Sequence, residues 1–80
     1  MKTHELKLHK RYYNAALCGA KPFEVRFNDR NYEVGDRLVL REFHDGEYTG
    51  NVMIKDVTYV LDDCLYLKEG YVVLGTRSPV

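Results

Sequence analysis

Gly19-Ala20-Lys21-Pro22-Phe23-Glu24-Val25-Arg26 is the stretch of sequence that decides the fold of this 80-residue chain. A glycine followed three residues later by a proline is typical of the end of a helix, and the alternating residues that follow predict a strand over residues 23–27. Side chains alternate along a strand, so the two phenylalanines and the valine would share one face while Glu24 and Arg26 share the outer face. With Lys21 just before it, this strand would hold three charged groups in fixed positions, which suits an anionic or planar polar ligand.

The segments on either side predict one early helix and several short strands. Two alanines and the spacing of apolar positions favour a helix over residues 9–18. Alternation and turn residues predict further strands, and Asp56 indicates a bulge or bend in the long one. These strands cover residues 4–8, 37–43, 51–61 and 71–76. We therefore expect a single domain over residues 1–80, mainly β (α+β), built as a small, partly closed barrel of five to six strands with one helix after the first strand.

The charges are balanced over the whole chain but not along it. Twelve Lys and Arg face twelve Asp and Glu, yet residues 1–41 carry nine basic and five acidic side chains while residues 42–80 carry three and seven. The neutral total argues against indiscriminate polyanion binding, while the basic half leaves room for a local anion site. Charge balance between two packed halves is an equal alternative. No stretch resembles a signal peptide or a membrane span, so we expect a cytoplasmic protein without a membrane partner.

The cysteines and histidines predict no cofactor. Cys18 and Cys64 are too few for a disulfide scaffold and lack metal-ligand spacing, so we expect both to be reduced, small core residues rather than nucleophiles. The three histidines do not form a metal site by their spacing. We therefore expect neither a metal nor another cofactor.

Two interpretations of the charged stretch stay open at this point. Lys21 and Arg26 could donate to an anion or a base edge, with Glu24 accepting from a ligand amine or acting as a general base. Alternatively, the glutamate and arginine form a surface ion pair while the lysine caps the preceding helix. Spacing alone favours the second interpretation.

Other polar and aromatic residues are weaker candidates. His4, at the start of the first strand, could contact a ligand or shuttle a proton, although a partly exposed, hydrogen-bonded histidine is more common there. Arg30, in the turn after residue 27, could reach a ligand phosphate, but bracing between strands is the better expectation. Four tyrosines could stack on bases, and tyrosine is also a routine strand residue. These are Tyr48, Tyr59, Tyr66 and Tyr71.

The run from Gly19 to Arg26 resembles the glycine-x-lysine-x-x-glutamate-x-arginine signature of the ASCH domain (activating signal cointegrator homology), which belongs to the PUA-like superfamily of β-barrels. Val34-Gly35-Asp36 falls where these domains carry a glycine-aspartate turn before a barrel strand. The likeness extends over residues 4–76 to a small bacterial and phage branch of unknown function. The resemblance therefore implies a single ASCH/PUA-like domain with a PUA-like barrel.

The same resemblance implies a function. ASCH domains are generally proposed to bind RNA or modified nucleotides in a cleft lined by the signature, which implies an RNA- or nucleotide-binding module using Lys21, Glu24, Arg26, Arg30 and His4. One bacterial branch is an amidohydrolase of N4-acetylcytidine, and its catalytic lysine matches Lys21, while Glu24 stands where that branch has threonine. The alternative is therefore a small amidohydrolase of an acylated cytidine, with Lys21 and Glu24 as its catalytic groups. A domain that mainly contacts another protein is a third possibility. We expect binding rather than catalysis.

Overall fold

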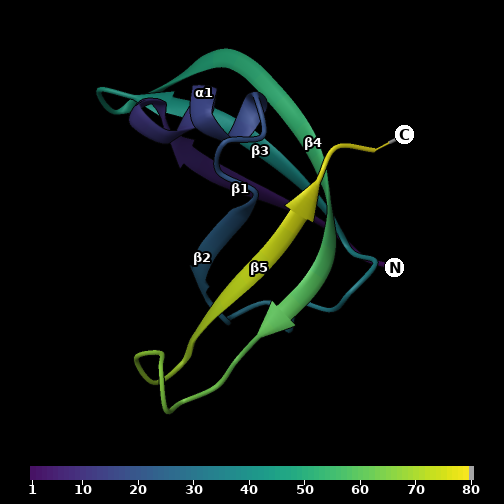
Figure 1. Ribbon diagram of the computed structural model, residues 1–80. Helices are drawn as coiled ribbons and strands as arrows, with labels where there is room; N and C mark the ends of the chain where they lie inside the picture. Colours follow the sequence, from purple (N-terminus) through teal and green to yellow (C-terminus); the bar gives the residue numbers. More distant parts are fainter. Residues whose placement is uncertain (80) are drawn as a thin grey trace.

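The computed structural model describes residues 1–79 as one sheet of five strands with a single short helix after the first strand (Figure 1). This confirms the mainly β architecture expected from the sequence. The elements are β1 (Thr3–His9), α1 (Lys10–Leu17), β2 (Phe23–Phe27), β3 (Arg37–His44), β4 (Glu47–Leu61) and β5 (Tyr71–Arg77).

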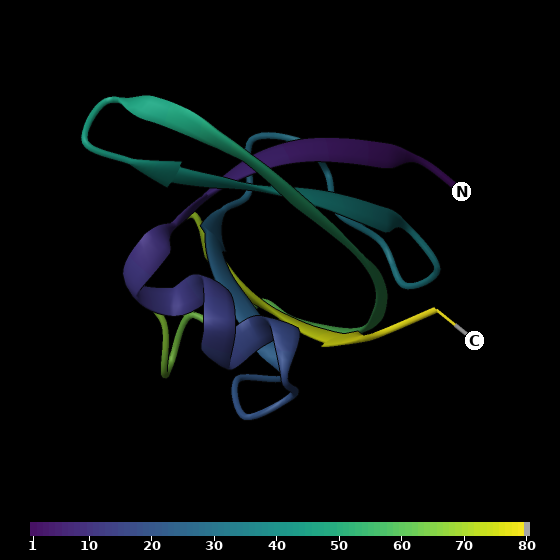
Figure 2. The ribbon, with the colours of Figure 1, turned by 90° about the horizontal axis from the view of Figure 1, so that it is seen from above.

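The sheet curls into a half-barrel whose two edge strands are β1 and β2. The strand order is β1-β3-β4-β5-β2, with β1 parallel to β3 and the other neighbours antiparallel. Figure 2 shows the curvature of the sheet, with α1 lying across one end of it. The ladder between β4 and β5 shifts register between Val57 and Tyr59, just after Asp56, where the sequence predicted a bulge. This irregularity lies within β4, the long strand that crosses the sheet.

Alternate residues of the strands build the core on the concave face. In β1 and β3 every second side chain is buried, and Leu38 and Leu40 are fully inaccessible to solvent. The helix adds Tyr13 and Ala16 from its inner side. Gly19 ends the helix with φ +85°, a conformation that costs a glycine little, and the Lys21 amide then donates to the Ala15 carbonyl at 2.9 Å.

Strand β2 corrects one prediction, because its charged face points inward. Glu24 is 2% exposed, whereas Val25 and Phe27 are each 55% exposed. Glu24 pairs with Leu74 of β5, whose side chain is fully buried, and paired residues of neighbouring strands point to the same side. The register with β5 therefore sets the orientation of β2, and the alternation within the strand could not reveal which face would be buried.

The cysteines correct a second prediction, because both are exposed. Cys18 follows the last turn of α1, and Cys64 lies in the connection between β4 and β5. The helix α1 has eight residues with a polar average composition, so the described chain contains no helix that could cross a membrane.

Candidate ligand-binding cleft

Glu24 is the buried centre of an ion cluster whose two cations are partly exposed. Its Oε2 lies 2.7 Å from the Lys21 Nζ, and its Oε1 lies 2.8 Å from the Arg26 Nη2. The glutamate side chain is 3% exposed, and the two cationic side chains are 19% and 20% exposed. The structure thus brings together the three residues that the sequence singled out. Two cations on one carboxylate offset the cost of removing it from water.

The chain positions the two cations from opposite sides of the glutamate. Lys21 lies in the turn after α1, and its Nζ also donates to the Phe23 carbonyl at 2.9 Å. Arg26 reaches across the open side of the half-barrel, where its Nη2 donates to the carbonyl of Lys7 in β1 at 2.8 Å. The Arg26 Nε is buried and has no hydrogen-bond partner among the described residues. Arg26 therefore links the two edge strands through its Nη2.

Two hollows flank this link, and together they form a cleft along the open side of the half-barrel. We call it the β1–β2 cleft. The inner hollow, next to α1, has a volume of about 460 Å³ and contains the ion cluster. Its lining consists of Lys7, Leu8, His9, Tyr12, Lys21, Glu24, Val25 and Arg26.

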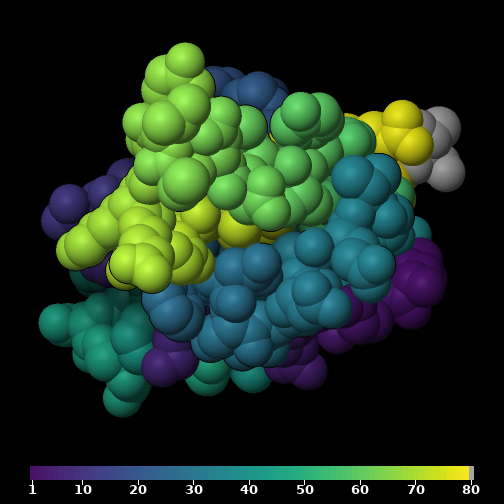
Figure 3. Space-filling model, turned by 90° about the horizontal axis from the view of Figure 1, so that it is seen from below, coloured from purple at the N-terminus to yellow at the C-terminus, as the bar shows by residue number. Residues whose placement is uncertain are grey.

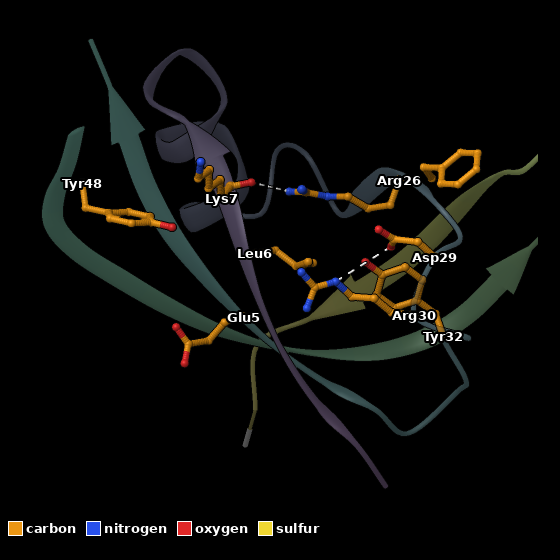
Figure 4. A pocket seen from close by; sticks show the side chains of 9 residues that line it. Glu5, Leu6, Lys7, Arg26, Asp29, Arg30, Tyr32 and Tyr48 are labelled. Atoms are coloured by element: carbon orange, nitrogen blue, oxygen red, sulfur yellow. Dashed lines mark hydrogen bonds and ion pairs between the residues drawn. The ribbon is translucent and has the colours of Figure 1, made fainter. Parts of the chain in front are cut away.

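The outer hollow lies beyond the link, between β1 and the turn that follows β2 (Figure 4). Its volume is about 350 Å³, and its lining includes Arg26, Arg30, Tyr32 and Tyr48. Arg30 is exposed and makes only a long contact of 3.9 Å to its neighbour Asp29, so it does not brace the strands as the sequence suggested. Its guanidinium is accessible from the hollow.

Two residues that line the cleft, Lys7 and Tyr12, were not singled out by the sequence, because nothing in their local pattern distinguishes them from other surface residues. Lys7 lines both hollows, and Tyr12 closes the inner one from the helix. Of the four tyrosines considered for base stacking, Tyr48 lines the outer hollow, with the Arg41 guanidinium 3.8 Å from its ring centre. Tyr59 and Tyr66 are exposed elsewhere.

The structure places His4 in the core, outside the residues that line the cleft. Its Nε2 lies 2.9 Å from the Asp36 Oδ2, and its ring packs edge-on against Tyr32 with 4.8 Å between ring centres. Burial raises the pKa of Asp36, but hydrogen bonds from His4 and from the backbone amides of Lys2 and Glu33, with the Lys2 charge, outweigh it and lower that pKa to about 2. His4 and Asp36 thus tie the loop before β3 to β1.

Within residues 1–79, no three His, Cys, Asp or Glu side chains are grouped as a metal ion would require.

Comparison with known proteins gives a family and one phage relative. Residues 3–76 match the family described as "Domain of unknown function (DUF3850)". An "Uncharacterized 12.9 kDa protein in GpA 3'region" of Escherichia phage P2 is 45% identical over 73 residues, which cover 91% of this chain. The match spans 66% of that relative, so the chain corresponds to about two thirds of the phage protein.

Proposed function

The chain belongs to the DUF3850 family, and we propose that it is an RNA- or nucleotide-binding module whose ligand enters the β1–β2 cleft. The proposal includes the ASCH-like, PUA-like character that the residues from Gly19 to Arg26 suggest, and a cytoplasmic site of action. The observation that carries it is the buried Glu24 carboxylate, paired with the partly exposed Lys21 and Arg26, at the wall of a hollow of about 460 Å³.

A buried ion cluster at this position is a poor way to stabilise a fold. Replacing such clusters by apolar side chains of similar volume is often neutral or stabilising, so their presence calls for another explanation. Held by two cations, Glu24 keeps a fixed position from which it can accept from the exocyclic amine of a base. The exposed guanidinium of Arg30 supplies donors for a phosphate or a base edge.

The charge of the cleft favours a ligand with few phosphates. Its lining holds four cations, Lys7, Lys21, Arg26 and Arg30, against three carboxylates, so the excess is a single positive charge. A long nucleic acid that follows a strongly basic groove needs more than this. A nucleotide or a short single-stranded segment, read by its base as well as its phosphate, fits better.

The experiment measures binding to a labelled short single-stranded RNA by fluorescence anisotropy at several salt concentrations. Arg30→Ala is the informative variant because Arg30 makes only the long contact to Asp29, so its loss should leave the fold intact. We expect Arg30→Ala to weaken binding several-fold and to lower the salt slope by about one. Lys68→Ala, in the exposed connection between β4 and β5, is the matched control. Equal affinity in wild type, Arg30→Ala and Arg26→Lys would remove the proposal.

Glu24→Gln separates two roles of the carboxylate. If Glu24 reads a base amine, the variant should lose affinity for cytosine- or adenine-containing ligands. If it only neutralises Lys21 and Arg26, the variant gains a net positive charge and should bind every phosphate ligand more tightly, with the gain fading at high salt. Circular dichroism checks that each variant is folded.

Amide hydrolysis is a second candidate, favoured by the 2.7 Å contact between the Lys21 Nζ and the Glu24 Oε2 at the wall of the inner hollow. A lysine and a carboxylate in contact can activate water against an acylated amine. Glu24 would have to leave one of its two cations to act as a base, which is why we place binding first. Incubation with a panel of N4-acylated cytidines, analysed by chromatography, is the test, and no turnover across the panel would eliminate this candidate.

A further inference from the structure

The convex face of β4, β5 and β2 carries an aromatic and aliphatic surface that nothing in the described chain covers. In Figure 1 these three strands lie side by side, and their register aligns outward-facing residues in rows. Phe23, Val25 and Phe27 point outward from β2, Tyr71 from β5 and Tyr59 from β4. The outward positions between them hold a glycine, a valine and a leucine. We call this surface the convex apolar face.

The face and the two exposed residues of the adjoining connection together present more apolar surface than the largest patch of a typical monomer. Tyr59 is 63% exposed, Val25 and Phe27 are 55%, and Phe23 and Tyr71 are 37%. At roughly 200 Å² for a whole aromatic side chain, these five residues expose about 500 Å². Leu65 and Tyr66, 82% and 80% exposed in the adjoining connection, raise the total to about 800 Å². A standard protein interface covers about 800 Å² on each partner, and the largest apolar patch of a typical monomer is about 300–600 Å².

Charged residues border the face at its two ends and are absent from its middle. At the end of β5, Arg77 pairs in register with Asp56, which also accepts from the Arg37 Nε at 3.1 Å. At the other end, the connection 62–70 stands out from the body of the molecule (lime green in Figure 3) and carries three acidic residues and one lysine. The face is thus neutral, with a basic side chain at one end and net negative charge at the other.

We propose that the convex apolar face binds a second copy of this chain in a two-fold symmetric dimer. A two-fold interface brings the same surface together from both copies, so it requires a surface that does not repel itself. An uncharged sheet face meets that condition, and sheets pack face to face through such surfaces. Packing the two faces with opposite strand directions also lays the acidic connection of each copy beside Arg77 of the other. A second copy of this chain is therefore the partner that this face fits, because the face is complementary to itself.

The dimer does not use the ion cluster, because alternation along β2 directs Glu24 and Arg26 to one side and the apolar residues to the other, but Val25 and Phe27 also line the inner and the outer hollow of the cleft. A dimer through this face would therefore border both β1–β2 clefts. It also accounts for an edge strand that otherwise presents two phenylalanines and a valine to water, which is a hazard for aggregation.

The experiment is sedimentation equilibrium of the wild-type chain and of two matched valine variants from about 1 μM to 500 μM. Val25→Glu places a charge in the middle row of the convex apolar face, on its edge strand β2, and the two-fold symmetry of the dimer would bring two such charges into the interface. Val52→Glu is the control, because Val52 is 49% exposed on the outer side of β4 but lies beyond the charged row of Asp56. Tyr59→Glu is measured as a second face variant, because Tyr59 lines neither hollow of the cleft whereas Val25 lines the inner one.

We expect the wild type and Val52→Glu to dimerise alike, and Val25→Glu to raise the dimer dissociation constant by about 100-fold or more. A wild type that stays monomeric at 500 μM overturns the proposal, and so does a face variant that dimerises as the wild type does. Loss of the dimer in both valine variants overturns it as well, because the contact would then not be specific to this face.

Discussion

The pair of His4 and Asp36 makes a pH-dependent contribution to stability that can be measured directly. Asp36 is 2% exposed and accepts hydrogen bonds from the His4 Nε2 and from the amides of Lys2 and Glu33. Its pKa falls from the ordinary 3.8 to about 2 on folding. At 1.36 kcal/mol for each pKa unit, the ionised carboxylate stabilises the fold by about 2 kcal/mol.

The sign follows from the direction of the shift. Because the pKa is lower in the folded chain, this stabilisation is complete above the ordinary pKa and is lost as the pH falls through the folded value. It should therefore be fully present at pH 5, drop to about 1 kcal/mol at pH 3 and vanish below pH 2. Asp36→Asn, which cannot ionise, should be less stable than the wild type at pH 7 by about 2 kcal/mol or more.

Urea unfolding followed by circular dichroism at pH 7, 5, 3 and 2 measures both effects. Asp29→Asn is the matched control, since the Asp29 side chain is 61% exposed and only 3.9 Å from its nearest cation. The difference between wild type and Asp36→Asn should shrink by about 2 kcal/mol from pH 5 to pH 2, while Asp29→Asn should track the wild type. A constant difference across this range would refute the assignment of the low pKa to Asp36.

Two further substitutions test the loop and the core by thermal unfolding. Gly35→Ala should cost about 1–2 kcal/mol from backbone strain alone, because Gly35 has φ +94° and an added Cβ would meet nothing within 4 Å; a cost near zero would mean that the loop adopts another conformation. Leu40→Ala should cost about 2–5 kcal/mol, since Leu40 is fully buried in the half-barrel, while Leu65→Ala, at 82% exposure, should cost little; equal losses would contradict the assigned core.

The sequence predicted most of the fold because local patterns specify it. The helix end at Gly19, the number of strands and the bulge after Asp56 follow from periodicity and turn chemistry, which act over a few residues, whereas β4 begins at Glu47 and not at the predicted residue 51. The orientation of β2 did not follow. Which of two alternating faces is buried depends on pairing with β5, almost fifty residues later in the chain, and no local pattern carries that information.

The site was predictable in part for the same reason. Lys21, Glu24 and Arg26 lie close in the sequence, so a strand and a turn bring them together whatever the rest of the chain does. Lys7 and Tyr12 reach the cleft only because β1 forms the opposite edge of the half-barrel. His4 was named from its place beside a strand start, and its partner Asp36 lies 32 residues away.

The inverted polarity of β2 links the two proposals. An isolated domain would gain stability by turning Phe23, Val25 and Phe27 inward and leaving the charged residues in water, yet the chain does the reverse. The inward glutamate requires two cations to offset its burial, and the outward rings stay in contact with solvent. The buried glutamate and the exposed apolar side chains are both explained if each face of the strand binds a partner. The inward charged residues of β2 then read a polar ligand in the β1–β2 cleft, the convex face packs against a second copy, and a single five-residue strand connects the two functions.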